Sequence, residues 1–191
     1  MNFVGTATLM TPRLLLRKFC IEDVDAMYCN WASDPNVTQY LTWDYHKNQH
    51  ETEQVVTSWM SRYNNPDFYL WCIEYRPEQK PIGSIGIVTF DVEKENARIG
   101  YCLSSHYWNK GIMSEALATV VRFLFCTVGF RTIMAYHHPL NIASGKVMAH
   151  VGMKPLPVQA DNNAYGYAIH QHDYVSQLNK GLNHDCSKQR H

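Results

Sequence analysis

The 191-residue sequence lacks the features that mark membrane and nucleic-acid-binding proteins. No window approaches the run of about eighteen uncharged apolar residues that a membrane-spanning helix needs. Residues 1–9 lack the basic region and long apolar stretch of a secretory signal. Charge of either sign is not in excess either, because 17 Lys and Arg balance 17 Asp and Glu. We therefore expect a soluble cytoplasmic protein that binds neither membranes nor nucleic acid directly.

Clustered metal ligands and paired cysteines are also missing. The six cysteines include no C-x-x-C pair and fall mostly in apolar runs, so we interpret them as reduced core thiols. Among the ten histidines, His137 and His138 are adjacent, and His170 and His172 would alternate along a strand. Neither pair has a carboxylate beside it at ligand spacing, so we expect no metal site.

Two nucleotide-binding patterns are absent. The sequence contains neither G-x-x-x-x-G-K-[ST] nor G-x-G-x-x-G. A phosphate-loop ATP site and a dinucleotide-binding fold are therefore both disfavoured.

The composition nevertheless allows a folded domain, with 46% apolar and 18% charged residues. Runs rich in β-branched and aromatic residues predict strands, and apolar stripes at spacings of three and four predict helices. The expected strands are residues 8–19 (interrupted at Pro12), 68–75, 82–90, 97–103, 131–137, 153–158 and 165–174. The expected helices cover residues 21–31, 49–63, 113–125 and 141–151.

This order of elements predicts an α+β fold. Short polar connections join the strands between residues 68 and 103 into an antiparallel meander, and strand–helix alternation follows. We expect a mixed, mostly antiparallel sheet of about seven strands flanked by about four helices. Residues 1–176 should form a single domain, and the polar, aperiodic residues 177–191 should be a disordered C-terminal tail.

The most informative segment is a strand that runs into a glycine-centred turn and then a long helix. The strand is Ile99-Gly100-Tyr101-Cys102-Leu103-Ser104, and Gly111 lies at the centre of the turn. The first N–H groups of a helix lack internal partners and lie at the positive end of its dipole. Such a turn can hold a phosphate or pyrophosphate, although many turns of this kind are merely tight connections.

Four motifs in this order resemble the GNAT acetyltransferase superfamily, especially its ribosomal-protein N-terminal (alanine/serine) acetyltransferase-like branch. They are Thr11-Pro12-Arg13-Leu14-Leu15-Leu16-Arg17, Ile99-Gly100-Tyr101, Tyr107-Trp108-Asn109-Lys110-Gly111-Ile112-Met113-Ser114-Glu115-Ala116, and Asn141-Ile142-Ala143-Ser144 with Gly152-Met153. The resemblance covers about residues 8 to 175.

The resemblance implies a GNAT-like sheet with a splayed pair of parallel strands that binds acetyl-CoA as cosubstrate, without a metal. Pantetheine would pair with the backbone of Tyr101, Cys102 and Leu103. The pyrophosphate would rest on backbone N–H groups of the loop that matches the family's Q/R-x-x-G-x-G/A pattern. Its residues are Trp108, Asn109, Lys110, Gly111, Ile112, Met113 and Ser114.

The loop departs from the family pattern at Trp108 and Met113, where the branch commonly varies. Contacts made by backbone N–H groups tolerate such changes. A third departure concerns mechanism, because Arg98 stands where the branch often carries a glutamate that can act as general base.

The resemblance also suggests catalytic roles. It makes Ser144 the general acid that protonates the leaving CoA thiolate, and it puts Asn141 near the pantetheine or the acceptor. Both residues have a plainer interpretation, as an N-cap and a first-turn residue of one helix. Asp161 falls near a carboxylate position of some members and is the candidate base, or simply a solvated loop residue. Cys102 is better explained as a buried structural thiol than as a nucleophile.

The expected reaction is direct attack of a primary amine on the thioester in a ternary complex. An α-amine has a pKa of about 7.8 and a lysine side chain one of about 10.4, so the lysine needs about 3.5 kcal/mol more to become neutral. Without the usual glutamate, a protein N-terminal α-amine or a weakly basic small amine is the easier acceptor. The alternative is a non-catalytic acyl-CoA-binding sensor or interaction module. A homodimer is a further expectation from the branch.

Aromatic residues between the early helices and the closing hairpin could shape the acceptor groove. They are Trp31, Tyr40, Trp43, Tyr45 and Tyr165. Core packing explains most aromatic residues equally well. Because Trp43, Asp44 and Tyr45 fall in a polar loop, we expect these three to be the ones that face a ligand.

Overall fold

A computed structural model describes residues 1–157 and 164–176. Their centre is an eight-stranded mixed sheet with the strand order β1-β2-β3-β4-β5-β6-β8-β7. Neighbouring strands run antiparallel except β5 and β6, which are parallel. The strands are β1 (Leu9–Met10), β2 (Leu14–Arg17), β3 (Leu70–Tyr75), β4 (Lys80–Asp91), β5 (Asn96–Leu103), β6 (Thr132–His137), β7 (Lys154–Pro155) and β8 (Tyr165–His170). The predicted α+β class and the mostly antiparallel sheet are therefore confirmed.

The helices are α1 (Asp23–Met27), α2 (Pro35–Thr38), α3 (Gln49–Arg62), α4 (Ile112–Phe123) and α5 (Ile142–His150). A π-helical turn extends α1 over Tyr28–Ala32, and another extends α4 over Leu124–Val128. Gly129 ends this extended helix, with φ of 92°.

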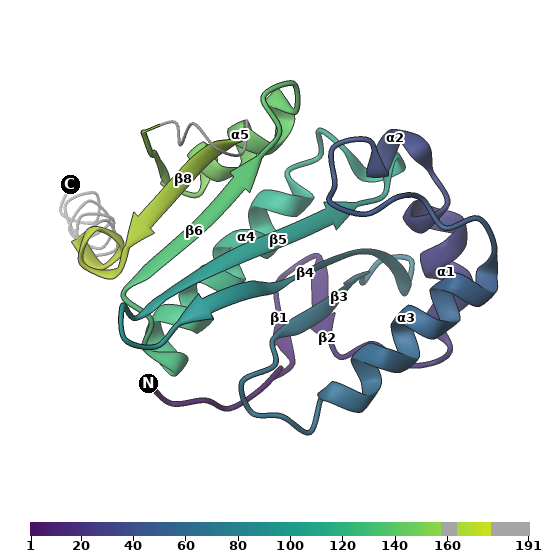
Figure 1. Ribbon diagram of the computed structural model, residues 1–191, viewed down its shortest axis with the longest axis horizontal. Helices are drawn as coiled ribbons and strands as arrows, with labels where there is room; N and C mark the ends of the chain where they lie inside the picture. The colour runs from purple at the N-terminus through teal and green to yellow at the C-terminus, as the bar shows by residue number, and fades with distance from the viewer. Residues whose placement is uncertain (158–163, 177–191) are drawn as a thin grey trace, which may run out of the picture.

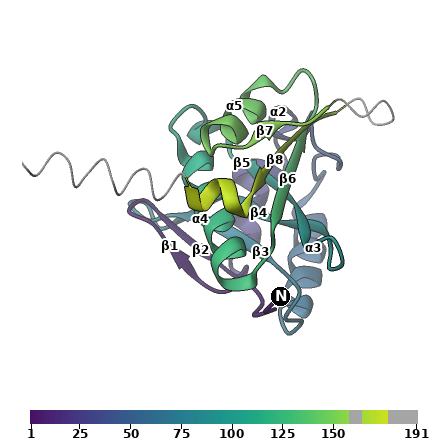
Figure 2. The same cartoon turned by 90° about the vertical axis from the view of Figure 1, so that its left-hand side faces the viewer.

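The sheet has helices on both of its faces (Figures 1 and 2) and separates two hydrophobic clusters. Ala97, Ile99 and Leu103 of β5 join the larger cluster with the apolar faces of α4 and α5. Cys102 joins the smaller cluster with residues of α1 and α3. Figure 2 shows α3 and α4 on opposite sides of the sheet. Alternate residues of β5 therefore point to opposite faces of the molecule.

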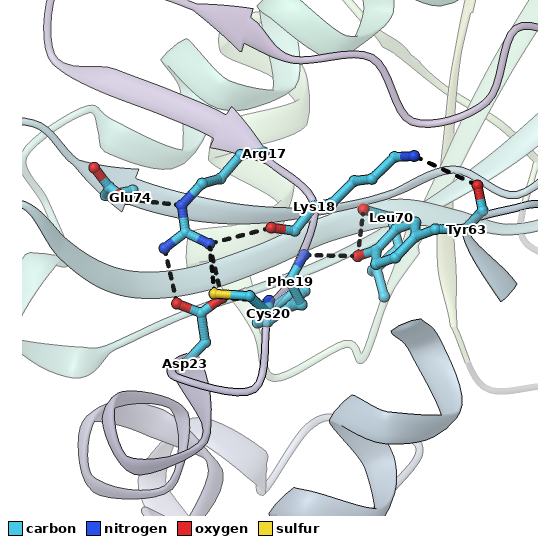
Figure 3. A network of polar contacts seen from close by, with 8 residues as sticks. All are labelled: Arg17, Lys18, Phe19, Cys20, Asp23, Tyr63, Leu70 and Glu74. Carbon is cyan, nitrogen blue, oxygen red and sulfur yellow. Dashed lines mark hydrogen bonds and ion pairs between the residues drawn. The ribbon is translucent and has the colours of Figure 1, made fainter. Parts of the chain in front are cut away.

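A buried charge network fixes α1 against the sheet (Figure 3). The Arg17 guanidinium donates to both Asp23 carboxylate oxygens, at 2.7 and 2.8 Å, and to Glu74 at 2.7 Å. The Cys20 N–H also donates to Asp23, at 2.9 Å. Asp23 is only 3% exposed, so these partners offset the cost of burying its charge.

Two of the expected strands end differently in the structure. The interrupted first strand is two separate strands, β1 and β2, which pair with each other antiparallel across the turn at Pro12. The last strand was predicted to reach residue 174, and this is wrong, because residues 171–176 are helical. Pairing stops at Thr132↔His170, where β6 begins, so the chain has no strand to pair with beyond this point. His172 therefore lies in a helix, with its ring stacked on that of His170.

A short helix was also missed. Asp34 caps α2, a helix absent from the expected elements, with its side chain accepting from the Asn36 N–H and Pro35 in the first turn. The expected tail, 177–191, lies outside the described residues. No helix among the described residues is long and apolar enough to cross a membrane.

Candidate functional site

The parallel strands β5 and β6 separate partway along their length. They pair from Asn96↔Thr132 to Ile99↔Ala135, and the remaining residues of β5, from Gly100 to Leu103, pair with β4 alone. The edge of β5 that faces β6 is therefore open over these residues. An open strand edge can accept an extended molecule as though it were another strand.

A cleft of about 1630 Å³ surrounds this opening. It is lined by Tyr101, Cys102 and Leu103 of β5 and by Asn141 and Ser144 at the start of α5. From the loop before α4 it takes Trp108, Asn109, Gly111, Ile112, Met113 and Ser114. The structure thus brings together nearly all of the predicted site residues in the part of the chain that it describes.

The loop before α4 presents free N–H groups to this cleft. Gly111 is the N-cap of α4, with φ of 71°, and no side chain caps the helix. Asn109 also has a positive φ, 59°. The N–H groups of residues 109–114 have no hydrogen-bond partner within the described chain, and the next one, of Glu115, bonds to the Gly111 carbonyl. Such a row of donors at a helix N-terminus suits an anion.

Arg13 and Glu115 hold this loop in place. The Arg13 guanidinium donates to the Lys110 carbonyl at 2.9 Å and to the Glu115 carboxylate at 2.6 Å. The Thr11 hydroxyl also donates to Glu115. Burial raises the pKa of Glu115, but the hydrogen bonds from Thr11 and Arg13 outweigh burial and lower it, so the carboxylate stays charged. The Thr11-Pro12-Arg13 motif therefore fixes the position of the loop through hydrogen bonds to Lys110 and Glu115.

The side chains of Lys110 and Trp108 contact other parts of the protein. The Lys110 ammonium lies 5.2 Å from the centre of the Tyr107 ring, and Lys110 does not line the cleft. The Trp108 indole N–H donates to the Leu103 carbonyl at 2.8 Å and so ties the loop to the end of β5. Lys110 could therefore contribute to anion binding only through its backbone N–H group.

Ser144 is hydrogen-bonded to a half-buried tyrosine. The Tyr101 hydroxyl lies 2.9 Å from the Ser144 Oγ, and burial raises the pKa of Tyr101 to about 12 although this bond opposes the shift. The Asn141 side chain accepts from the Ser144 N–H at 3.2 Å. The N-cap interpretation of Asn141 is therefore confirmed, and it orients Ser144 in the first turn of α5.

The sequence did not reveal the contact between Tyr101 and Ser144, nor that between Arg13 and Glu115. Both pairs join residues far apart in the chain. The four motifs of the Sequence analysis contain all four residues, so membership of a motif was the only indication in the sequence that these residues matter. Only the packing of β2 and β5 against α4 and α5 shows which of them meet.

The expected base is not placed, because Asp161 lies outside the described residues. Asp91 is the one carboxylate among the described residues that line the cleft, and hydrogen bonds from Lys94 hold its pKa below the usual value. Glu95 is engaged elsewhere, in an ion pair with Arg131 at 2.6 Å. Arg98, at the position where the resemblance would have a glutamate, lines the cleft.

The remaining predicted residues divide among the cleft, the core and the exposed surface. Cys102 is buried, with its Sγ 3.2 Å from the Ser84 hydroxyl, and burial raises the pKa of this thiol, as suits a structural cysteine. Trp31 is fully buried in the core. Tyr40 and Trp43 line the cleft, whereas Tyr45 and Tyr165 are exposed and do not line it. Among the described residues, no group of three or more His, Cys, Asp or Glu could hold a metal ion.

Known proteins share both the sequence and the fold. An uncharacterized N-acetyltransferase of Bacillus licheniformis, p20, is 30% identical over 141 residues, which cover 74% of this chain and 79% of that protein. A GNAT-family acetyltransferase from Bacillus anthracis has a crystal structure that matches with a TM-score of 0.74 at 25% identity, over 87% of this chain and 99% of that one.

The structure of RimL, a ribosomal L7/L12 α-N-protein acetyltransferase in complex with coenzyme A, matches with a TM-score of 0.75 at 20% identity. That match covers 86% of this chain and 98% of RimL. Residues 13–154 match the family model described as the Acetyltransferase (GNAT) domain, and they contain both the separating strand pair and the loop before α4. The chain therefore belongs to the GNAT family and is an acetyltransferase.

Proposed function

We propose that the protein transfers the acetyl group of acetyl-CoA to a primary amine by direct attack in a ternary complex. The observation that carries this proposal is that one cleft holds both the open edge of β5 and the free N–H groups of Asn109 and of residues 111–114. The first feature suits an extended pantetheine arm and the second a pyrophosphate. RimL, whose fold this chain shares, was solved with coenzyme A.

The cofactor residues follow from this arrangement. Tyr101 and Cys102 offer open strand edge to the pantetheine, and the Leu103 carbonyl is already held by Trp108. The N–H groups of Asn109 to Ser114 bind the pyrophosphate, and Gly111 provides the left-handed turn that aims them at it.

The reaction joins the neutral amine nitrogen to the thioester carbonyl carbon, and the carbon–sulfur bond breaks. The Ser144 hydroxyl gives its proton to the departing CoA sulfur and is restored by the proton that the amine nitrogen releases. The net products are an amide and free CoA thiol. Ser144 fits this role because the Asn141 cap and the Tyr101 hydroxyl hold it at the cleft wall.

The acceptor is proposed to be a protein N-terminal α-amine or a weakly basic small amine. The described part of the cleft has no carboxylate besides Asp91, which is engaged by Lys94. Without a strong base, an amine that is already partly neutral near pH 7 reacts most readily. A lysine side chain would first have to lose its proton.

Two measurements test the proposal. A thermal-shift series would compare acetyl-CoA, desulfo-CoA, ATP and NAD, because a ligand at a hundredfold excess over its Kd stabilises by about 2.7 kcal/mol. We expect stabilisation by the two CoA compounds alone. Release of CoA thiol on addition of peptide or small amines then separates catalysis from mere binding. Binding without any release would favour the non-catalytic acyl-CoA sensor instead.

A further inference from the structure

The cleft contains an arginine, Arg98, that forms no ion pair with any carboxylate in the described part of the chain. Arg98 is half-buried, and the β5 pleat points it to the face opposite α4 and α5, on the same side as Cys102. Its register partners are Thr89 of β4 and Met134 of β6, and all three line the cleft. Arg98 therefore lies on the sheet floor of the site.

The guanidinium is held along the floor by Tyr136. It lies 5.7 Å from the centre of the Tyr136 ring, an arrangement in which the cation is attracted to the aromatic face. The ring in turn lies against Gly166 of β8, where a Cβ atom would come within 2.8 Å of the tyrosine Cε1. The orientation of Arg98 thus depends on packing that a larger residue at position 166 would disturb.

No hydrogen bond or ion pair engages the Arg98 guanidinium within residues 1–157 and 164–176. By contrast, three other arginines have carboxylate partners, namely Arg13, Arg17 and Arg131. A guanidinium that is partly withdrawn from water gains from an anion that can accept its paired N–H donors.

Arg98 also lies beside the opening of the sheet. Arg98↔Met134 is the next-to-last pair before β5 and β6 separate beyond Ile99↔Ala135. Under the proposed function, this opening is where the thioester meets the amine. A group bound by Arg98 would therefore belong to the acceptor and would lie only a few bonds from its amino nitrogen.

We propose that Arg98 selects acceptors that carry a carboxylate close to the reacting amine. This inference rests on the proposed function and adds the substrate class to it. Such a carboxylate has two sources, the α-carboxylate of a free amino acid or the acidic side chain at the N-terminus of a peptide. In both, the planar guanidinium binds the carboxylate and leaves the neutral amine facing the opening.

The test compares acceptors that differ only in this charge. Peptides beginning with Asp are paired with the same peptides beginning with Asn, and alanine is paired with alaninamide. The kcat/KM ratio within each pair is measured for the wild-type enzyme and for Arg98→Gln. Differences in amine basicity cancel, because both enzymes receive the same acceptors.

For one pair, the kcat/KM ratio of the carboxylate-bearing member to the uncharged member should be about ten-fold or more higher in the wild type than in Arg98→Gln, since a hydrogen bond to a charged group is worth that much. Arg98→Lys, which keeps the charge without the planar fork, should give an intermediate ratio. The pair that responds identifies the source of the carboxylate.

Arg62→Gln is the matched control, because Arg62 also lies over an aromatic ring, that of Phe68 at 4.2 Å, but outside the cleft. It should keep the wild-type ratios. Thermal stabilisation by acetyl-CoA tests whether each Arg98 variant is folded. If Arg98→Gln does not fold, the kcat/KM ratios of Arg98→Lys test the inference instead. Equal ratios in the wild type and the Arg98 variants would overturn this inference alone. Absence of CoA release with every acceptor would overturn the proposed function as well.

Discussion

The Tyr101 hydroxyl lies 2.9 Å from the Ser144 Oγ and joins the open part of β5 to the first turn of α5. The same hydroxyl is 3.3 Å from the Ser144 carbonyl oxygen, so the phenol contacts both the hydroxyl and the backbone carbonyl of this serine. Two hydroxyl groups are thus brought together where the strands separate. Substituting each residue in turn therefore tests the role of its hydroxyl group.

Replacing Ser144 with alanine should lower kcat by about 100-fold or more, the usual contribution of a general acid, with little change in the Kd of acetyl-CoA. Single-turnover kinetics and titration calorimetry measure the two quantities. Unchanged turnover would remove Ser144 from the mechanism.

Tyr101→Phe should lower kcat by a smaller factor, about ten-fold, because the serine remains but loses the hydrogen bond that orients it. The matched control is Tyr63→Phe. Tyr63 is also a tyrosine with a raised pKa, and it does not line the cleft; its hydroxyl accepts from the Phe19 N–H and donates to the Leu70 carbonyl. That control should lose stability and keep its kcat. Equal kcat values in the two variants would argue against a positioning role for Tyr101.

Gly111→Ala and Gly129→Ala should each destabilise the fold by about 1 kcal/mol, because both glycines have left-handed backbones, with φ of 71° and 92°. Neither added Cβ would clash, since the nearest atoms lie 3.6 and 3.9 Å away. Only Gly111→Ala should weaken acetyl-CoA binding. Urea unfolding and calorimetry separate the two effects, and equal affinities would leave Gly111 a purely structural residue.

Arg13→Gln should weaken acetyl-CoA binding by about five-fold, because the hydrogen bonds from the Arg13 guanidinium to the Lys110 carbonyl and the Glu115 carboxylate are lost. Arg131→Gln breaks a comparable ion pair, with Glu95 at 2.6 Å, outside the loop. The control should bind acetyl-CoA as the wild type does. If both variants bind alike, Arg13 does not hold the loop in its binding conformation.

Asp23→Asn should lower the free energy of unfolding by about 2 kcal/mol near neutral pH. Burial raises the pKa of Asp23, but its hydrogen bonds to Arg17 and Cys20 outweigh burial and lower it. A lowered folded pKa contributes stability that is present above the ordinary carboxyl pKa and is lost as the pH falls through the folded value.

The difference between the wild type and Asp23→Asn should therefore shrink in acid, below a pH of about 3.9. Denaturant unfolding over a series of pH values measures it. Asp173→Asn removes a surface ion pair with Lys154 and should cost little at any pH. A difference for Asp23→Asn that does not depend on pH would show that its charge does not stabilise the fold.

Local patterns in the sequence determined most of the elements of this protein. The apolar stripe from Met113 onward predicted α4, and the runs at residues 82–90 and 97–103 predicted β4 and β5. Gly111 identified the turn that precedes α4. These features depend on neighbouring residues alone, because periodicity and capping act within a few positions along the chain.

The tertiary structure alone decided where β5 and β6 separate, which hydroxyl meets Ser144 and which residues hold the loop. The contact of Arg13 with Glu115 joins residues 102 positions apart, and that of Tyr101 with Ser144 joins residues 43 apart. The end of β8 at His170 likewise depends on where its partner β6 begins. Such features arise from strand register and from packing between distant segments, and no local spacing encodes them.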